Sequence, residues 1–274
     1  MEKQGKFNKL FVHVVLIFGA FMMILPFVWM ILTSGKTFAE TVQIPPKILP
    51  NNFKFENYQT VWNSLDFISF YLNTGIMIVL RIVTSTLFSA MAAFAVAKLE
   101  FRGKNLFFWM VLTQMMVPVQ IFLTPQYLLV QRLGLLDTRL ALVIPGIVSA
   151  FGTFLLRQFF MGLPDELMEA ARIDGASIWQ IFFKIYLPLA KSGLVALSIF
   201  TALFAYKDLM WPLVVNISQD KLTLSAGLSL LQGQYMTNYS QLMAGSVIAV
   251  IPMILLYVAF QKQFIQGIAT TGGK

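Results

Sequence analysis

Long apolar stretches separated by short polar segments set the plan of this chain. Residues 11–33 contain no formal charge, and as a helix at about 1.5 Å per residue they cover about 35 Å. That length crosses the hydrocarbon core of a bilayer. The stretch is longer than the apolar core of a secretory signal, and no small-residue cleavage site follows it closely. We therefore expect an uncleaved first transmembrane span.

Five further apolar stretches predict an all-α integral membrane protein with six transmembrane helices. Their expected bounds are 73–97, 106–130, 140–156, 187–215 and 242–261, with a break at Pro145-Gly146 in the fourth. The connecting segments are expected to be an external loop over 35–70 with a short helix near 56–63, an external turn at 132–139, and an external segment over 216–241 with its own short helix. We divide the chain into an N-terminal helix with its external loop (1–68), a transmembrane core (69–264) and a cytoplasmic tail (265–274).

The distribution of positive charge orients these spans. Composition is 58% hydrophobic and 12% charged, with a formal net charge of +8, which in a membrane protein reports topology rather than nucleic-acid binding. Of the 20 Lys and Arg residues, six fall on one side of the predicted membrane (Lys36, Lys47, Lys54, Arg132, Arg139 and Lys221), two lie within spans (Arg81 and Lys207), and the rest fall on the other side. The richer side is expected to be cytoplasmic, with both termini.

The longest charged interruption precedes the fifth span. Pro164 suits the first turn of a helix, and the acidic residues after it favour the positive end of the helix dipole. Asp174-Gly175 supplies a residue able to turn left-handed and end that helix. Ser177 and Gln180 form a capping box that starts the next one. The sequence thus predicts a short cytoplasmic helix, a sharp bend and a longer helix entering the membrane.

This loop resembles the EAA loop of ABC importer permeases. The resemblance rests on Glu169-Ala170-Ala171, Gly175 four residues later, and Ile185-x-Leu187-Pro188. Nearly the whole chain is similar to the second permease subunit of the maltose-type carbohydrate importers, through Leu72-Asn73-Thr74, Gly134 to Thr138, Phe154 to Phe160, and Gln232 to Tyr235 with Met243-Ala244. The resemblance implies a type I ABC importer permease fold with a cytoplasmic coupling helix, in a bacterial cytoplasmic membrane.

The resemblance also implies partners and coupling residues. The partners would be a homologous second permease, two ATPase subunits, an extracytoplasmic sugar-binding protein and membrane lipid. The expected coupling residues are Leu163, Leu167, Glu169, Ala170, Ala171, Asp174 and Gly175. Glu169 would offer a carboxylate to a groove on the ATPase, the alanines would permit close approach, and Leu163, Leu167 and Ile173 would supply apolar contact.

Charges inside the predicted spans mark a candidate translocation path. A charge near the bilayer centre costs about 3 kcal/mol on insertion scales, so Arg81 and Asp208 need partners or water. Asp208 is expected to meet either Arg81 or a base on a partner subunit; the alternative is that Arg81 reaches the outer headgroups. The candidates are Arg81, Gln114, Gln120, Tyr206, Lys207, Asp208 and Trp211. The aromatic rings could stack on a sugar, or serve packing and the interfacial belt.

Two of these residues depart from the family pattern. Lys207 stands where the family usually has a neutral residue before the acid, and Arg81 stands at a usually apolar position. The substrate is therefore left open, and a permease for a non-sugar solute is the alternative.

Other classes of function lack their required residues. The tetrad Ser34-Gly35-Lys36-Thr37 resembles the end of a phosphate loop, but Met30 occupies the position of its first glycine. We expect no bound cofactor here, and ATP-Mg on the partner subunits. With no Cys and one His, no metal or catalytic site is expected. A secondary transporter, a membrane enzyme and an assembly protein remain the rival interpretations.

Overall fold

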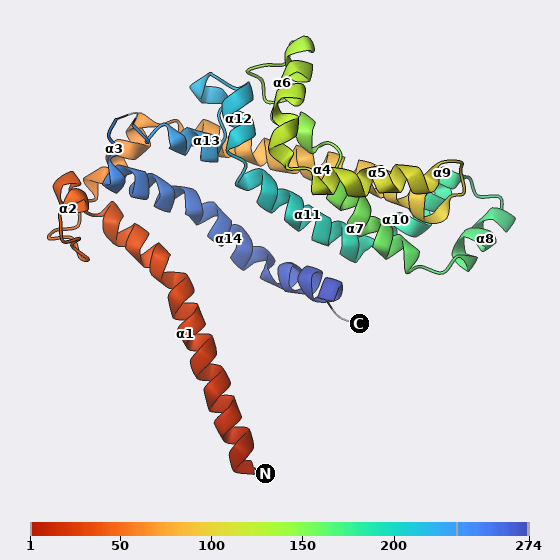
Figure 1. Ribbon diagram of the computed structural model, residues 1–274, viewed down its shortest axis with the longest axis horizontal. Coiled ribbons are helices and arrows are strands. Elements are labelled where there is room, and N and C mark those ends of the chain that lie inside the picture. Colours follow the sequence, from red (N-terminus) through yellow and green to blue (C-terminus); the bar gives the residue numbers. More distant parts are fainter. Residues whose placement is uncertain (1, 234, 273–274) are drawn as a thin grey trace. The chain divides into compact units, whose positions relative to one another are not determined.

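The computed structural model describes residues 2–233 and 235–272, and the regular elements in this part of the chain are all helical (Figure 1). They are α1 (Glu2–Ser34), α2 (Phe38–Val42), α3 (Glu56–Ser64), α4 (Phe67–Lys98), α5 (Lys104–Met116), η1 (Val119–Phe122), α6 (Leu123–Arg132), η2 (Ile144–Gly146), α7 (Ala150–Met161), α8 (Glu166–Ile173), α9 (Ile178–Ile181), η3 (Phe182–Tyr186), α10 (Leu187–Leu189), α11 (Lys191–Tyr206), α12 (Met210–Val215), η4 (Gln219–Lys221), α13 (Leu224–Ser229) and α14 (Tyr239–Gly272).

The chain forms two compact units. One comprises Met1–Asp66 and Leu228–Leu255, and the other comprises Phe67–Gly227 and Leu256–Lys274. The helix expected near 56–63 is confirmed as α3, and the short helix expected within 216–241 is α13. The division of the chain at residues 68 and 264 stays a prediction of the sequence.

Several helices are long and apolar enough to cross a membrane. Among the described residues, three qualify singly: Phe11–Ser34, Phe67–Lys98 and Ile144–Met161. Two pairs qualify if each bent pair is one span: Lys104–Met116 with Val119–Arg132, bent by 104°, and Ile178–Leu189 with Lys191–Tyr206, bent by 76°. Tyr239–Leu255 is a shorter apolar helix. The all-helical membrane class is confirmed, whereas the count of six spans stays a prediction.

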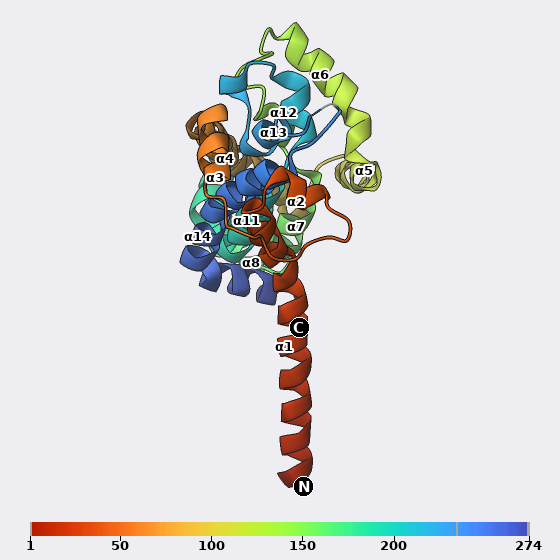
Figure 2. The same ribbon diagram turned by 90° about the vertical axis from the view of Figure 1, so that its left-hand side faces the viewer.

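The third predicted span is not one continuous helix. It breaks between Met116 and Val119 because Pro118 has no N–H for the helical ladder. Proline also disfavours helical geometry in the residue before it, and Val117 is accordingly extended, with ψ of 129°. The helices α5 and α6 on either side of this break are bent by 104° (Figure 2), so 106–130 is one span only if the bent pair counts as one, which stays a prediction.

The fifth predicted span is also corrected. The helix α11 ends at Tyr206, and α12 begins only at Met210 after a break at Lys207–Leu209. Before α11, residues 182–186 form one turn of π-helix, which the sequence analysis did not anticipate. Pro188 cannot bond to the carbonyl four residues before it, and a widened turn accommodates that gap.

In the second unit, α4 packs along both α7 and α11. The helices approach closely at two glycines. A Cβ on Gly152 of α7 would lie 2.8 Å from the Ser89 hydroxyl, and one on Gly193 of α11 would lie 2.7 Å from the Phe159 ring. Side-chain-free positions thus allow α4, α7 and α11 to form one tightly packed group.

Two buried clusters lie at different levels of α4. The first gathers around Phe94, with Phe160, Phe182 and Tyr186. The second gathers around Met77, with Leu142, Trp211 and other side chains from the 130–142 and 205–215 segments. Each cluster supports one of the two candidate sites described next.

Candidate functional site

The loop between α7 and α9 has the geometry that its sequence predicts. α8 spans Glu166–Ile173, with Glu166 and Glu169 in its first turn. Gly175 ends it with φ of +78°, in the left-handed region. Ser177 and Gln180 then form the capping box, each side chain bonded to the other residue's backbone N–H. The result is a short helix, a fixed bend and a new helix start.

Lys98, the last residue of α4, fastens the beginning of this loop. Its Nζ donates to the carbonyl of Leu163 at 2.6 Å and lies 2.5 Å from the Asp165 carboxylate. The lysine side chain is only 4% exposed, whereas that of Asp165 is 81% exposed. The sequence analysis missed this role, because Lys98 appeared only as an inner-side topology signal.

Tyr186, the last residue of the π-helix η3, holds the start of the loop at a second point. Its side chain is fully buried, and its hydroxyl donates to the carbonyl of Pro164 at 3.4 Å. The ring centroid lies 5.2 Å from that of Phe94 and 6.1 Å from that of Phe160. Through Lys98 and Tyr186, the start of the loop is held to α4 and to η3.

One face of α8 is open and the other is packed. Glu169, Ala170, Ile173 and Asp174 are exposed, with Ile173 87% exposed, and Leu167 is half-buried. Ala171 is only 7% exposed and packs into the core around Phe94.

One expectation for the loop needs correction. Ala171 packs into this chain's own core instead of facing outward, whereas Leu163 packs against that core but is only half-buried. Helical periodicity explains why the two alanines differ, because adjacent residues on a helix point in different directions. Ala170 lies on the open face of α8, and Ala171 lies on the packed face. The Glu-Ala-Ala signal did not show which alanine faces outward.

The second site is an ion pair between α4 and the segment after α11. Arg81 Nη1 lies 2.9 Å from Asp208 Oδ2, with the two side chains 8% and 22% exposed. Arg81 also donates from Nε and Nη2 to the carbonyl of Leu142, at 2.9 and 2.6 Å. Of the alternatives considered for Asp208, the structure realises the pair with Arg81.

The Arg81 side chain lies directly against Gly146. A Cβ on that glycine would sit 2.6 Å from Arg81 Cδ. Trp211 binds the residue just before Leu142, because its Nε1 donates to the carbonyl of Ala141 at 2.8 Å. Because Trp211 is 5% exposed and belongs to the core around Met77, its role is packing, and the expectation that it could stack on a solute is corrected.

Lys207, Gln114 and Gln120 do not take part in this pair. Lys207 is exposed, with its Nζ 5.2 Å from the Phe204 ring centroid, and Tyr206 is half-buried. Gln114 and Gln120 are exposed on either side of the Pro118 break. These amides are therefore not packed among this chain's own helices, and their place in the translocation path stays a prediction.

A polar network that the sequence analysis did not find holds the turn at 134–142. Arg139 donates to the Asn73 side-chain oxygen at 2.8 Å, and Asn73 donates to the carbonyls of Asp220 and Leu222. The Asp137 carboxylate accepts from the Ser218 hydroxyl and from the N–H groups of Ile217 and Ser218, bonds that lower the pKa of Asp137. The position of Asn73 at the start of an apolar stretch was the one sequence signal that could have indicated this network.

The chain is thus an all-helical membrane protein with an internal ion pair and an exposed loop that is fastened to the helix carrying that pair. Residues 85–270 match the family described as "Binding-protein-dependent transport system inner membrane component". The chain belongs to this family, whose members are permeases of ABC importers.

Known relatives cover nearly the whole chain. The arabinooligosaccharides transport system permease protein AraQ of Halalkalibacterium halodurans is 36% identical, covering 94% of this chain and 93% of the relative. The diacetylchitobiose uptake system permease protein NgcG of Streptomyces coelicolor is 33% identical, covering 92% and 84%. The sn-glycerol-3-phosphate transport system permease protein UgpE of Pectobacterium atrosepticum is 33% identical, covering 94% and 95%.

A solved structure confirms the fold class. A chain from the crystal structure of a bacterial ABC transporter involved in the import of the acidic polysaccharide alginate superposes with a TM-score of 0.77. It is 26% identical, and the match covers 94% of this chain and 96% of that one. Discontinuous helices, expected of a secondary transporter, are present here at Pro118 and near Ala190, so family membership and not helix continuity separates the two interpretations.

Proposed function

We propose that this chain is a permease subunit of an ATP-driven importer that carries a carbohydrate across the bacterial cytoplasmic membrane, with both termini cytoplasmic. It pairs with a homologous permease and receives its solute from an extracytoplasmic sugar-binding protein. Two ATPase subunits hold the ATP-Mg, so hydrolysis takes place outside this chain. Relatives named for arabinooligosaccharide and diacetylchitobiose transport support the solute class.

The attachment of the α8 loop to α4 carries the proposal. The open face of α8, with Glu169, Ala170 and Ile173, docks into a groove on the ATPase, and the half-buried Leu167 borders the contact. Asp174 and Gly175 fix the bend behind it. When the ATPase subunits close, the loop moves, and Lys98 and Tyr186 pass the displacement to α4 and to η3.

α4 then carries the displacement to the ion pair. Arg81 and Lys98 stand on the same helix, about 25 Å apart at about 1.5 Å per residue, with no proline between them. A shift of α4 therefore acts on the Arg81–Asp208 pair and on the turn bonded to it. Arg81 and Asp208, with Tyr206, Lys207, Gln114 and Gln120, are proposed to border the solute path together with the second permease.

Glu169→Ala tests the docking role. Glu169 is exposed, so its loss leaves the permease folded while removing a charged acceptor from the interface. A hydrogen bond to a charged group is worth about 1.5–3 kcal/mol, so we expect about tenfold or greater loss of ATPase subunits retained on the purified permease. Glu100→Ala is the matched control, since Glu100 is an exposed acid paired with Lys104 at another cytoplasmic turn. Equal retention of the ATPase subunits by both variants would show that Glu169 is not part of the interface.

A non-sugar solute is the second candidate, favoured by the relatives named for sn-glycerol-3-phosphate transport. Uptake into vesicles containing the assembled importer and its binding protein decides between them. The proposal expects labelled di- or oligosaccharide to accumulate with ATP, and accumulation of glycerol phosphate alone would replace it with the second candidate.

A further inference from the structure

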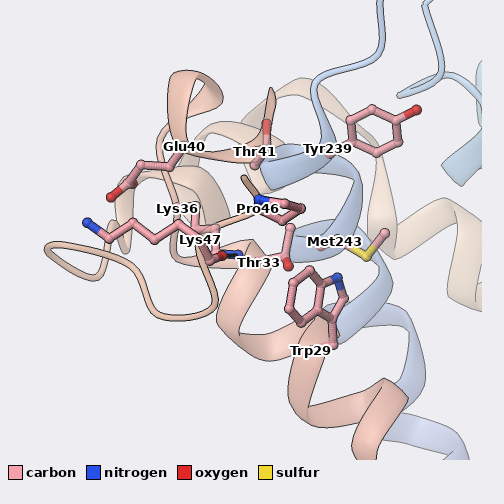
Figure 3. A pocket seen from close by; sticks show the side chains of 9 residues that line it. All are labelled: Trp29, Thr33, Lys36, Glu40, Thr41, Pro46, Lys47, Tyr239 and Met243. Carbon is pink, nitrogen blue, oxygen red and sulfur yellow. Dashed lines mark hydrogen bonds between the residues drawn. The ribbon is translucent and has the colours of Figure 1, made fainter. Parts of the chain in front are cut away.

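A cavity of about 210 Å³ lies in the first unit, between the end of α1 and the start of α14 (Figure 3). It is several times larger than the roughly 30 Å³ that one water occupies in the liquid. The residues that line it are Trp29, Thr33, Lys36, Glu40, Thr41, Pro46, Lys47, Tyr239 and Met243. None of them belongs to the coupling loop or to the Arg81 site.

Lys36 places a buried positive charge at this cavity. The residue is 2% exposed, and its Nζ donates to the carbonyl of Lys47 at 2.6 Å and lies 4.5 Å from the Trp29 ring centroid. Within the described part of the chain, no carboxylate oxygen lies within 4.0 Å of Lys36 Nζ. An ammonium has three donors, so this group can bond further acceptors.

The nearby acid, Glu40, is occupied elsewhere. Its carboxylate accepts from the N–H groups of Thr37 and Asn51, which together with the Thr37 hydroxyl lower the pKa of Glu40 to about 2. Burial lowers the pKa of Lys36, and the charge of Glu40 only opposes this from a distance. Lys36, Lys47 and Glu40 therefore leave the cavity with one excess positive charge.

Thr33 adds an unused hydroxyl. The residue is 6% exposed, lines the cavity, and its Oγ1 has no hydrogen-bond partner among residues 2–233 and 235–272. Buried polar groups are rarely left unbonded, so this hydroxyl indicates an acceptor in the cavity. Trp29 and Thr33 lie four residues apart, on one side of the end of α1, and Lys36 follows in the turn just after the helix.

Below this level, α1 presents an apolar surface. Phe27, Val28 and Ile31 are 45–51% exposed, and burial in α1 becomes complete only at Thr33. The cavity thus stands where the lipid-facing part of a transmembrane helix ends. A molecule with apolar chains and an anionic head matches both surfaces, and Trp at such a level is typical of the membrane–water interface.

We propose that this cavity binds the phosphate of an anionic phospholipid, whose acyl chains lie along α1. Lys36 Nζ and Thr33 Oγ1 donate to the phosphate oxygens, and Trp29 packs at the level of the glycerol backbone. The lipid fixes the end of α1 and the loop after it in one arrangement. The proposal depends on α1 spanning the membrane and does not depend on which solute is transported.

Lipid binding to the full-length chain in its detergent-purified complex tests this. Dioleoyl-phosphatidylglycerol or dioleoyl-phosphatidylcholine is titrated in, and retained lipid is counted by native mass spectrometry. The wild type is expected to retain phosphatidylglycerol at least tenfold better than phosphatidylcholine. Lys36→Met should lower phosphatidylglycerol affinity about tenfold, and Thr33→Val about threefold, since bonds to charged groups are the stronger ones.

Thr33→Val protects the test against misfolding. Its hydroxyl bonds nothing within the described chain, so the nearly isosteric valine leaves the fold intact while removing a donor to the lipid. Lys54→Met is the matched control, because Lys54 lies in the same external loop but outside the cavity lining. Equal affinity of wild type and Thr33→Val, equal retention of both lipids, or loss in Lys54→Met as large as in Lys36→Met would each overturn the proposal. Inorganic phosphate that displaces the lipid at equal concentration would assign the cavity to free anions instead.

Discussion

Gly175→Val is expected to uncouple ATP hydrolysis from uptake. Gly175 has φ of +78°, a conformation that costs other L-residues about 1–2 kcal/mol and β-branched residues more. A Cβ there would meet no atom within 4 Å, so the expected effect comes from the backbone conformation and not from a clash of the Cβ. The bend between α8 and α9 would relax, and docked α8 would no longer pass its displacement through α9 to η3, which carries Tyr186. We expect ATPase activity to persist while uptake falls about tenfold.

Two variants make this result specific to the bend. Gly175→Asn should keep most of the coupling, because Asn tolerates left-handed geometry far better than Val. Gly162→Val introduces the same side chain into the same loop at an ordinary φ of −77°, with its Cβ at a normal 3.5 Å contact, and should transport normally. Full coupled uptake by Gly175→Val at normal assembly would refute the mechanism.

Arg81→Met is expected to cause the largest loss of stability. It leaves the Asp208 carboxylate without its partner and deprives the Leu142 carbonyl of two donors. Breaking a buried ion pair from one side typically costs about 3–5 kcal/mol. Thermal unfolding of the purified complex should therefore shift sharply downward, with transport lost in parallel.

A double variant separates the contribution of the ion pair's charges from the contribution of the Arg81 side chain's shape. Arg81→Met with Asp208→Asn removes both charges, and should be more stable than Arg81→Met alone. Gly146→Ala should reproduce part of the single-variant loss, because its Cβ would displace Arg81, while Gly75→Ala on α4 meets no atom and serves as control. If the double variant is no more stable than Arg81→Met, the ion pair contributes nothing beyond shape.

How far the sequence predicts this molecule depends on the range of each signal. Local signals performed well: the end of α8 at Gly175, the capping box at Ser177 and the helix at α3 follow from neighbouring residues. Proline effects were only half anticipated. Pro118 and Pro188 were visible, but whether a proline kinks, widens or breaks a span depends on packing around it.

The contacts that build the sites join residues far apart in sequence. Lys98 meets Leu163 across 65 residues, and Arg81 meets Leu142 across 61. The cost of a charge inside the membrane indicated that Arg81 needs a partner, but it did not indicate which residue would lie near it. The same lack of long-range information left Trp211 among the path candidates and Ala171 on the wrong face.

The unbroken course of α4 from Arg81 to Lys98 has a thermodynamic consequence. If occupation of the cytoplasmic end changes the affinity of the outer end for its solute, linkage requires the converse by an equal factor. Solute bound in the path would therefore raise or lower the affinity of the ATPase for the α8 loop before any ATP is hydrolysed. Through this reciprocity, the binding of solute alone would set the rate of the importer's transport cycle.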